Sequence, residues 1–396
     1  MASIFTHFFQ YKSQIRNRWE SLDPNLRALL LGMLFLGINQ GILNSTFNNY
    51  LHDLFTQKAD ERGFLEFPRE LPGFAIVFIT GLLSAFSMRR WAMLVGIFSA
   101  VGVLGLGFAS PGIWIMMLWM IMWSLADHLF MPVEGTLGLQ FAKAKGEGKR
   151  LGQLSGARNL AMIIGTLIVS LTMSLGLRNY AVLYAVAGVF ALVATISFSM
   201  LKIQDAPNLQ PKGFVFRREY KYYYWLNILF GARKQIFLTF GPWVLVSVFG
   251  AKPETIALLL LIAAAIGVVF RQWFGICVDR FGEKAVLAVD AGVLMVICVG
   301  YAWSKNVYLL YIFYIIDNLM FATRIARTTY LNRIVIDKRD IAPTLSLGVT
   351  VDHAVSMTIP ALGGILWQAY GYPSVFIAAA LIAVANLFVS LKLGDQ

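Results

Sequence analysis

Long apolar stretches recur along the whole 396-residue chain and constrain its fold more than any other feature. A helix needs about 20 apolar residues to cross the hydrocarbon core of a bilayer. Because backbone polar groups must be satisfied within lipid, repeated stretches of this kind predict an all-α membrane protein. Twelve can be placed, at residues 27–50, 72–88, 91–109, 112–141, 152–176, 179–201, 222–248, 254–278, 285–303, 307–334, 341–366 and 371–391.

The composition excludes several other classes of protein. A chain that is 58% hydrophobic and 14% charged is too apolar for a soluble protein of two or three domains. Cys277 and Cys298 form no spaced motif, so neither a disulfide nor a metal site is expected. No nucleophile–base pair or phosphate-binding loop is recognisable, so we expect neither an enzyme nor a cofactor.

The distribution of basic residues predicts the orientation of the chain. Twelve spans place both termini on one side, and most of the 33 Lys and Arg residues lie in the connections on that side. The positive-inside rule makes this side cytoplasmic. The net charge of +12 then reflects topology, and no nucleic-acid partner is expected. We expect a monomer in the lipid bilayer of a bacterial plasma (inner) membrane, with both termini cytoplasmic.

One long connection divides the chain into two parts. Residues 203–221 form the longest predicted cytoplasmic connection and contain two prolines and a basic cluster, which favours a linker between helix bundles at 27–202 and 222–396. Residues 1–26 form a cytoplasmic N-terminal segment, either an amphipathic helix on the membrane or a disordered tail. The charged segment 51–71 is predicted to be a partly helical outer loop.

Charged residues inside the apolar stretches come in two matched sets. Asp127 and Glu134 are seven positions apart on one predicted helix, and Asp317 and Arg324 repeat this spacing 190 positions later. An ionised side chain in the membrane centre costs about 2.5–3.5 kcal/mol on the insertion scale, so such residues usually face a partner or a hydrated cavity. The repetition indicates two related half-bundles around one polar centre, which favours a transporter.

A loop motif connects the chain to a known family. Residues 275–284 read GICVDRFGEK, which resembles the G-x-x-x-D-R-x-G-x-[RK] loop motif of the major facilitator superfamily, with Asp279 and Arg280 at its core. In the first half, residues 81–90 keep the first glycine and the terminal basic pair but lack the Asp-Arg core. Pro360, Gly363 and Gly364 also resemble a pattern common in the eleventh span of that family.

The resemblance implies two six-helix bundles around a central cavity that is lined by spans 1, 4, 7 and 10. Polar residues lie in these four spans, as that fold requires. We expect a substrate-binding layer near the membrane centre, formed by Asn39, Gln40, Asn44, Arg233, Lys234, Asp317 and Arg324. The residues expected to couple protons or to gate access are Asp127, Glu134, Arg158, Asp352, His353, Asp279 and Arg280.

Simpler structural roles are open for most of these candidates. Asp127 and Glu134 could form a fixed salt bridge with Arg158. Arg233 could bind an anion or pair with Asp317 or Asp352. Asn39, Gln40 and Asn44 could hold helices together, and His353 could be a packing histidine. Asp290, in the ninth span, is expected to pair near Lys284 at a helix end.

We therefore predict a secondary transporter that moves a small polar, anionic organic solute by alternating access, with the proton as its coupling ion. A proton-independent exchanger or facilitator is one alternative, in which the acids merely neutralise the arginines. A flippase for a lipid or lipid-linked substrate is another.

Overall fold

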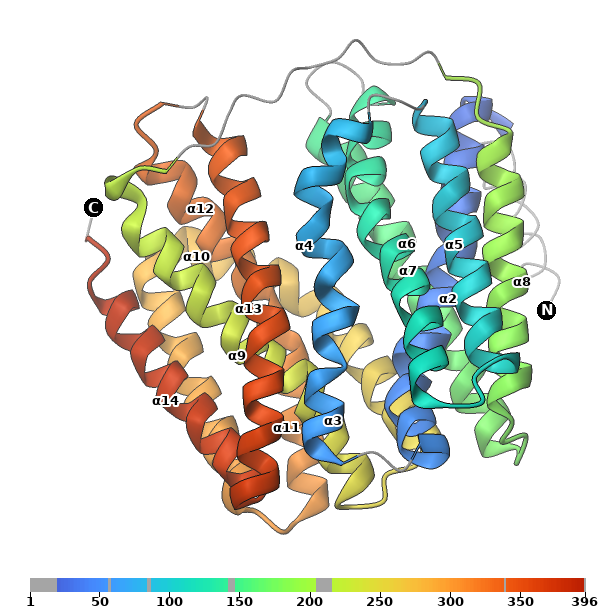
Figure 1. The fold of residues 1–396 in the computed structure, drawn as a ribbon. Coiled ribbons are helices and arrows are strands. Elements are labelled where there is room, and N and C mark those ends of the chain that lie inside the picture. The colour runs from blue at the N-terminus through green and yellow to red at the C-terminus, as the bar shows by residue number, and fades with distance from the viewer. Residues whose placement is uncertain are drawn as a thin grey trace, which may run out of the picture.

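The computed structural model describes residues 20–55, 58–83, 87–141, 147–203, 216–337 and 340–394. The predicted amphipathic helix or tail at 1–26 lies mostly outside these ranges, as does most of the predicted linker. Within them the structure is helical and corresponds to the predicted spans in order (Figure 1). The first half contains α2 (Pro24–Phe55), α3 (Ala59–Phe64), α4 (Glu66–Leu83), α5 (Met88–Phe108), α6 (Ile113–Gln140), α7 (Glu147–Ser174) and α8 (Tyr180–Ser199).

The second half begins with the short turn η1 (Arg218–Tyr220). It continues with α9 (Lys221–Ser247), α10 (Pro253–Trp303), α11 (Val307–Met320), the turn η2 (Phe321–Thr323), α12 (Arg324–Ile334), α13 (Ile341–Tyr370) and α14 (Tyr372–Leu391). α10 combines the predicted eighth and ninth spans around Gly282, whose φ of 76° breaks the helix. Such a backbone conformation suits glycine because it has no Cβ atom.

Ten of these helical segments are long and apolar enough to cross a membrane by length and composition. α4 and α9 are not among the ten, although they pack within the same bundles (Figure 1). Charged side chains lower their hydropathy, because α4 begins with Glu66, Arg69 and Glu70, and α9 contains Arg233 and Lys234. These charges are the first sign that both helices contribute to a polar site.

The two halves meet mainly along α13 and α10. α13 packs against α3 and α4, and α10 packs against α7. The end of the molecule at which α8 ends and α9 begins is called the linker end, and the end that carries α3 is called the far end (Figure 1).

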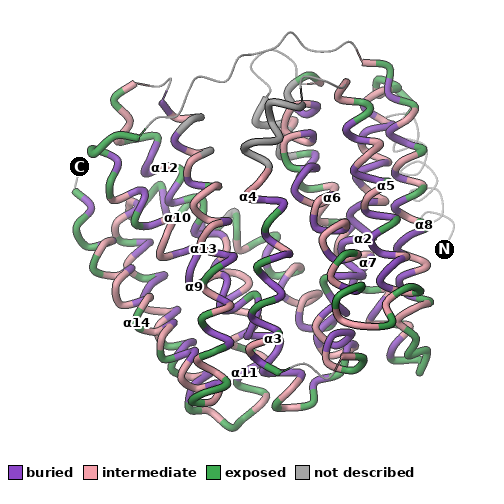
Figure 2. Tube along the Cα trace, viewed as in Figure 1, coloured by how far each residue is buried: buried purple, intermediate pink, exposed green. Residues whose placement is uncertain are grey.

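Figure 2 shows burial along the chain, and the buried apolar residues indicate where the halves are in contact. Towards the far end, one continuous cluster joins both halves, with Phe47 and Tyr184 from the first and Phe240 and Trp243 from the second. Towards the linker end, each half has its own separate cluster. The described apolar core therefore closes the far end and leaves the halves unjoined at the linker end.

Candidate functional site

A polar chain runs through the first half between α2, α6 and α7. Gln40 donates to Asp127 at 2.5 Å, and the Arg158 guanidinium donates to Gln40 at 3.0 Å and to Glu134 at 3.0 Å. The Arg158 and Glu134 side chains remain 22% and 16% exposed. The structure thus brings together the acids, the arginine and the glutamine that the sequence had placed on three separate helices.

The other two α2 candidates lie in different surroundings. Asn39 is fully buried; its amide donates to the Ala187 carbonyl at 2.9 Å and accepts from Ser99 at 3.1 Å. Both ends of this amide are satisfied by α5 and α8, so Asn39 joins helices. Asn44 is exposed and lies four positions after Gln40, on the same face of α2. Of the two, only Asn44 is exposed.

In the second half, α9 is joined to two neighbours by ion pairs. Arg233 bonds to Asp317 of α11, and both side chains are nearly inaccessible, at 2% and 3% exposure. Lys234 bonds to Asp352 of α13 at 2.5 Å, with 15% and 28% exposure. Adjacent residues on a helix point about 100° apart, which explains why the two cations reach different partners.

Three more charges surround these pairs. Asp290 of α10 is 2% exposed, and neither of its carboxylate oxygens has a hydrogen-bond partner among the described residues. The expected helix-end pairing of Asp290 is therefore wrong, since the side chain lies in the interior, within electrostatic range of Arg233 and Arg327. Arg327 is buried with its guanidinium over the Phe230 ring. Arg324 is exposed and forms no salt bridge with a described residue.

The predicted outer loop 51–71 contains charges that belong to the site. Its second part forms α3 and the start of α4, which confirms its partly helical character and extends the second span by six residues. Glu66 is 1% exposed; it pairs with Arg62 at 2.6 Å and also with Arg69. It further accepts from Gln235 of α9 at 3.0 Å, which connects the two halves.

A second connection between the halves contains two histidines. Glu70 of α4 accepts from His353 of α13 at 3.0 Å and lies 3.7 Å from His128 of α6. The two imidazole rings stack edge to face with centroids 4.8 Å apart. The sequence indicated a role for His353, but nothing in its local pattern paired that residue with Glu70, 283 positions away.

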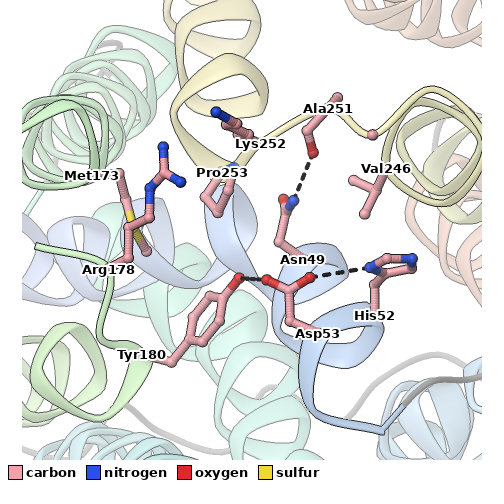
Figure 3. A pocket seen from close by; sticks show the side chains of 11 residues that line it. Asn49, His52, Asp53, Met173, Arg178, Tyr180, Val246, Ala251, Lys252 and Pro253 are labelled. Atoms are coloured by element: carbon pink, nitrogen blue, oxygen red, sulfur yellow. Dashed lines mark hydrogen bonds and ion pairs between the residues drawn. The ribbon is translucent and has the colours of Figure 1, made fainter. Parts of the chain in front are cut away.

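At the far end the halves are closed by polar contacts around a small cavity of about 200 Å³ (Figure 3). Asn49 donates to the Ala251 carbonyl at 2.8 Å, and Arg178 pairs with Glu254 at 2.6 Å. Both contacts cross from one half to the other. The loop-motif residues Asp279 and Arg280 lie at the linker end, are exposed, and form no salt bridge with a described residue.

The comparisons with known proteins agree with this arrangement. Residues 71–339, more than half of the chain, match the family model of the Major Facilitator Superfamily. The chain belongs to this family. No curated protein matches the chain. The superfamily consists of transporters, so this is a multi-pass membrane transporter and not an enzyme.

Solved structures of the superfamily share the fold at low sequence identity. A mutant of the nucleoside transporter NupG matches with a TM-score of 0.76 and 14% identity, over 94% of this chain and 100% of that one. A bacterial homologue of the iron transporter ferroportin, inward-facing, has a TM-score of 0.74 and 14% identity over 93% and 98%. The D-xylose-proton symporter has a TM-score of 0.66 and 16% identity over 93% and 97%. At this identity the matches establish the fold and leave the solute open.

Proposed function

We propose that this transporter moves a small polar organic solute with an anionic group, and that a proton moves with the solute. The observation that carries the proposal is the pair of ionic contacts on α9, Arg233 with Asp317 and Lys234 with Asp352. Adjacent cations on one helix are held by acids on two others. A change of charge on Asp317 would therefore weaken the contact between α9 and α11, and a change on Asp352 would weaken the contact between α9 and α13.

Protonation supplies such a change. A proton on Asp352 would cancel the charge that holds Lys234, and the ammonium group could then turn to a solute. Asp352 is the more accessible of the two α9-bound acids, at 28% exposure against 3% for Asp317. In the first half, Arg158 binds Glu134 directly and is connected to Asp127 through Gln40. The acids of the first half could then take up protons while the solute neutralises cations of the second half.

The proposal that the solute carries an anionic group rests on Arg324. The central acids and bases largely compensate one another, so the site has no large excess of positive charge. Arg324 differs because it is exposed and forms no salt bridge with a described residue. A guanidinium binds a carboxylate or phosphate through two parallel hydrogen bonds. Gln40 and Asn44 would bind hydroxyl or carbonyl groups of the same solute.

The described contacts support a route of access from the linker end. Inter-half bonds such as Glu66 to Gln235 and Arg178 to Glu254 lie between the bundle centre and the far end. We place the linker end in the cytoplasm, following the basic residues of its connections. The structure would then be the inward-facing state of a bacterial inner-membrane protein with both termini cytoplasmic. Rocking of the halves would open the far end.

The test is solute uptake into proteoliposomes under an imposed pH gradient. The panel should include nucleosides and pentoses, the solutes named for NupG and for the xylose symporter, and small carboxylates. We expect accumulation of one solute to follow the gradient and to collapse when an ionophore dissipates it. The double variant Asp127→Asn, Asp317→Asn should lose accumulation. The control variant Glu219→Gln, at an exposed acid, should keep it. Accumulation that ignores both the gradient and the double variant would refute proton coupling.

A proton-independent exchanger or facilitator is favoured by one observation. Asp317, Asp352 and Glu134 each have a cation partner already, as expected if they only neutralise buried bases. Counterflow of labelled solute with no gradient distinguishes the two functions. An exchanger would give full counterflow in the double variant, whereas a coupled transporter would show altered exchange and no uphill accumulation.

A further inference from the structure

We propose that Glu70, His128 and His353 form a binding site for a divalent transition metal of the zinc class, and that the bound metal fastens the two halves together. The three residues come from α4 and α6 of the first half and from α13 of the second. Metal binding does not depend on the proposed solute. The fastening of the halves rests on the proposed alternating access.

The geometry of the ligand atoms supports the site. One carboxylate oxygen and one nitrogen from each ring all lie within 4.8 Å of one another, and all three residues are buried. The Glu70 Oε2 atom is 3.0 Å from His353 Nδ1 and 3.7 Å from His128 Nε2. Zinc bonds to nitrogen and oxygen of about 2.0–2.2 Å would bring tetrahedral ligand atoms to slightly over 3 Å from each other. The ligands therefore need to move by about an ångström or less.

The hydrogen bonds of His128 determine what its second nitrogen can do. His128 Nδ1 lies 2.8 Å from the Ser124 carbonyl, which can only accept, so Nδ1 carries a hydrogen. The Ser124 hydroxyl, 3.1 Å from the same nitrogen, already donates to the Arg69 carbonyl and so also accepts from Nδ1. In the neutral ring, the Nε2 lone pair then faces Glu70.

A lone pair that faces a carboxylate in a buried site requires a cation between the two groups. A proton on Nε2 would satisfy it, and so would a metal ion. An imidazole whose Nδ1–H bonds to a backbone carbonyl while Nε2 is free is the arrangement that metal-bound histidines adopt. Two imidazoles and one carboxylate form a donor set that suits Zn²⁺, with a fourth position for water. The same donors also accept Co²⁺ or Fe²⁺.

The surrounding charges are compatible with a divalent ion. Arg69 binds the other oxygen of Glu70 at 3.1 Å and leaves Oε2 for the site. Arg69 is itself paired with Glu66, which offsets its positive charge. Asp127 directly precedes His128 in α6 and adds a negative charge nearby. Protons and metal compete for the two rings, so metal affinity should fall below neutral pH.

The position of the site gives the metal a consequence for transport. His353 belongs to the half opposite Glu70 and His128, and the α4–α13 contact is part of the closure of the far end. Opening the far end would separate His353 from the other two ligands. A metal held by all three would therefore favour the conformation described here and slow the exchange of access.

The binding test uses the full-length, tag-free protein in detergent and Zn²⁺ as the probe, measured by isothermal titration calorimetry. We expect one tight site per chain, weakened at least tenfold in His128→Ala and in His353→Ala. The matched control is His52→Ala, which removes an exposed histidine at the far end and should bind Zn²⁺ like the wild type. Wild-type binding that is absent, or that persists unchanged in both site variants, would overturn the site.

Two further measurements keep the proposal testable if the alanine variants fail to fold. Co²⁺ added to the wild-type protein should give the visible absorption of a four-coordinate nitrogen and oxygen site, and Zn²⁺ should displace it. In proteoliposomes, Zn²⁺ should slow solute counterflow at least tenfold for the wild type and His52→Ala but not for His353→Ala. Retained Zn²⁺ binding with unaltered counterflow would overturn the fastening role. Absent counterflow without Zn²⁺ would instead contradict the proposed transport, with the binding result unaffected.

Discussion

The ion pair between Arg233 and Asp317 should be strongly coupled. Both side chains are almost completely buried, at 2% and 3% exposure. Removal of one partner from a buried pair leaves an uncompensated charge and typically costs about 3–5 kcal/mol. Asp290 lies close enough to offset part of the charge left on Arg233. We therefore expect Asp317→Asn to lower the free energy of unfolding by about 3 kcal/mol, at the lower end of that range.

The double variant shows whether Arg233 and Asp317 stabilise the protein as a pair or independently of each other. Replacement of both members of a buried ion pair is often neutral, so Arg233→Gln combined with Asp317→Asn should cost about 1 kcal/mol or less. A double-mutant cycle should then give an interaction energy of several kcal/mol. The assay is reversible unfolding in mixed micelles, followed by tryptophan fluorescence.

A matched control is available at the far end. Arg178, in the connection between α7 and α8, pairs with Glu254 at the start of α10, but the arginine side chain is 51% exposed. Exposed pairs contribute about 0–1 kcal/mol. The reasoning is refuted if the interaction energy of the Arg233 pair is no larger than that of the Arg178 pair, because burial would then not decide the strength of these contacts.

Three further outcomes follow from the described contacts. A Cβ atom at Gly165 would lie 2.2 Å from a backbone carbonyl of α2, so Gly165→Ala should destabilise the protein by about 1–3 kcal/mol. Gly156→Ala, on the same helix with nothing within 4 Å, should cost nothing in the same unfolding measurement. Arg324→Gln should raise the KM for an anionic solute tenfold or more while the melting temperature stays unchanged, and Arg324→Lys should recover part of the loss; an unchanged KM would remove Arg324 from the site. Arg178→Ala should increase thiol labelling of a cysteine introduced in the far-end cavity, because one inter-half contact is lost; equal labelling rates would show that this ion pair does not hold the far end closed.

Much of the site was predictable because its residues lie on helices with a regular geometry. A rise of 1.5 Å per residue gives the depth of each side chain, and seven-residue spacing places Asp127 and Glu134 on one face. The location of Gln40 and Lys234 near the membrane centre follows in the same way. The order of the helices and the family itself also follow from hydropathy and the loop motif around Asp279.

The identity of each partner could not be obtained in this way. Whether Arg233 meets Asp317 or Asp352 depends on how α9 is rotated against α11 and α13, and hydropathy contains no information about that rotation. Asn39 and Asn44 look equivalent in the sequence, yet one is turned into a seam between helices and the other is exposed. Asp290 was misplaced for the same reason.

The amino-acid sequence by itself determined the membrane class, the helices, the two halves and the level at which charges collect, because these depend on local hydropathy and helical rise. Only the tertiary structure decided that Glu66 and Glu70 belong to the polar centre, since a hydropathy scan treats a charged stretch as a loop. Only the packing of α4, α6 and α13 brought two histidines to one carboxylate. Contacts between distant segments arise from the packing of whole helices, and a single sequence does not encode that packing in any local pattern.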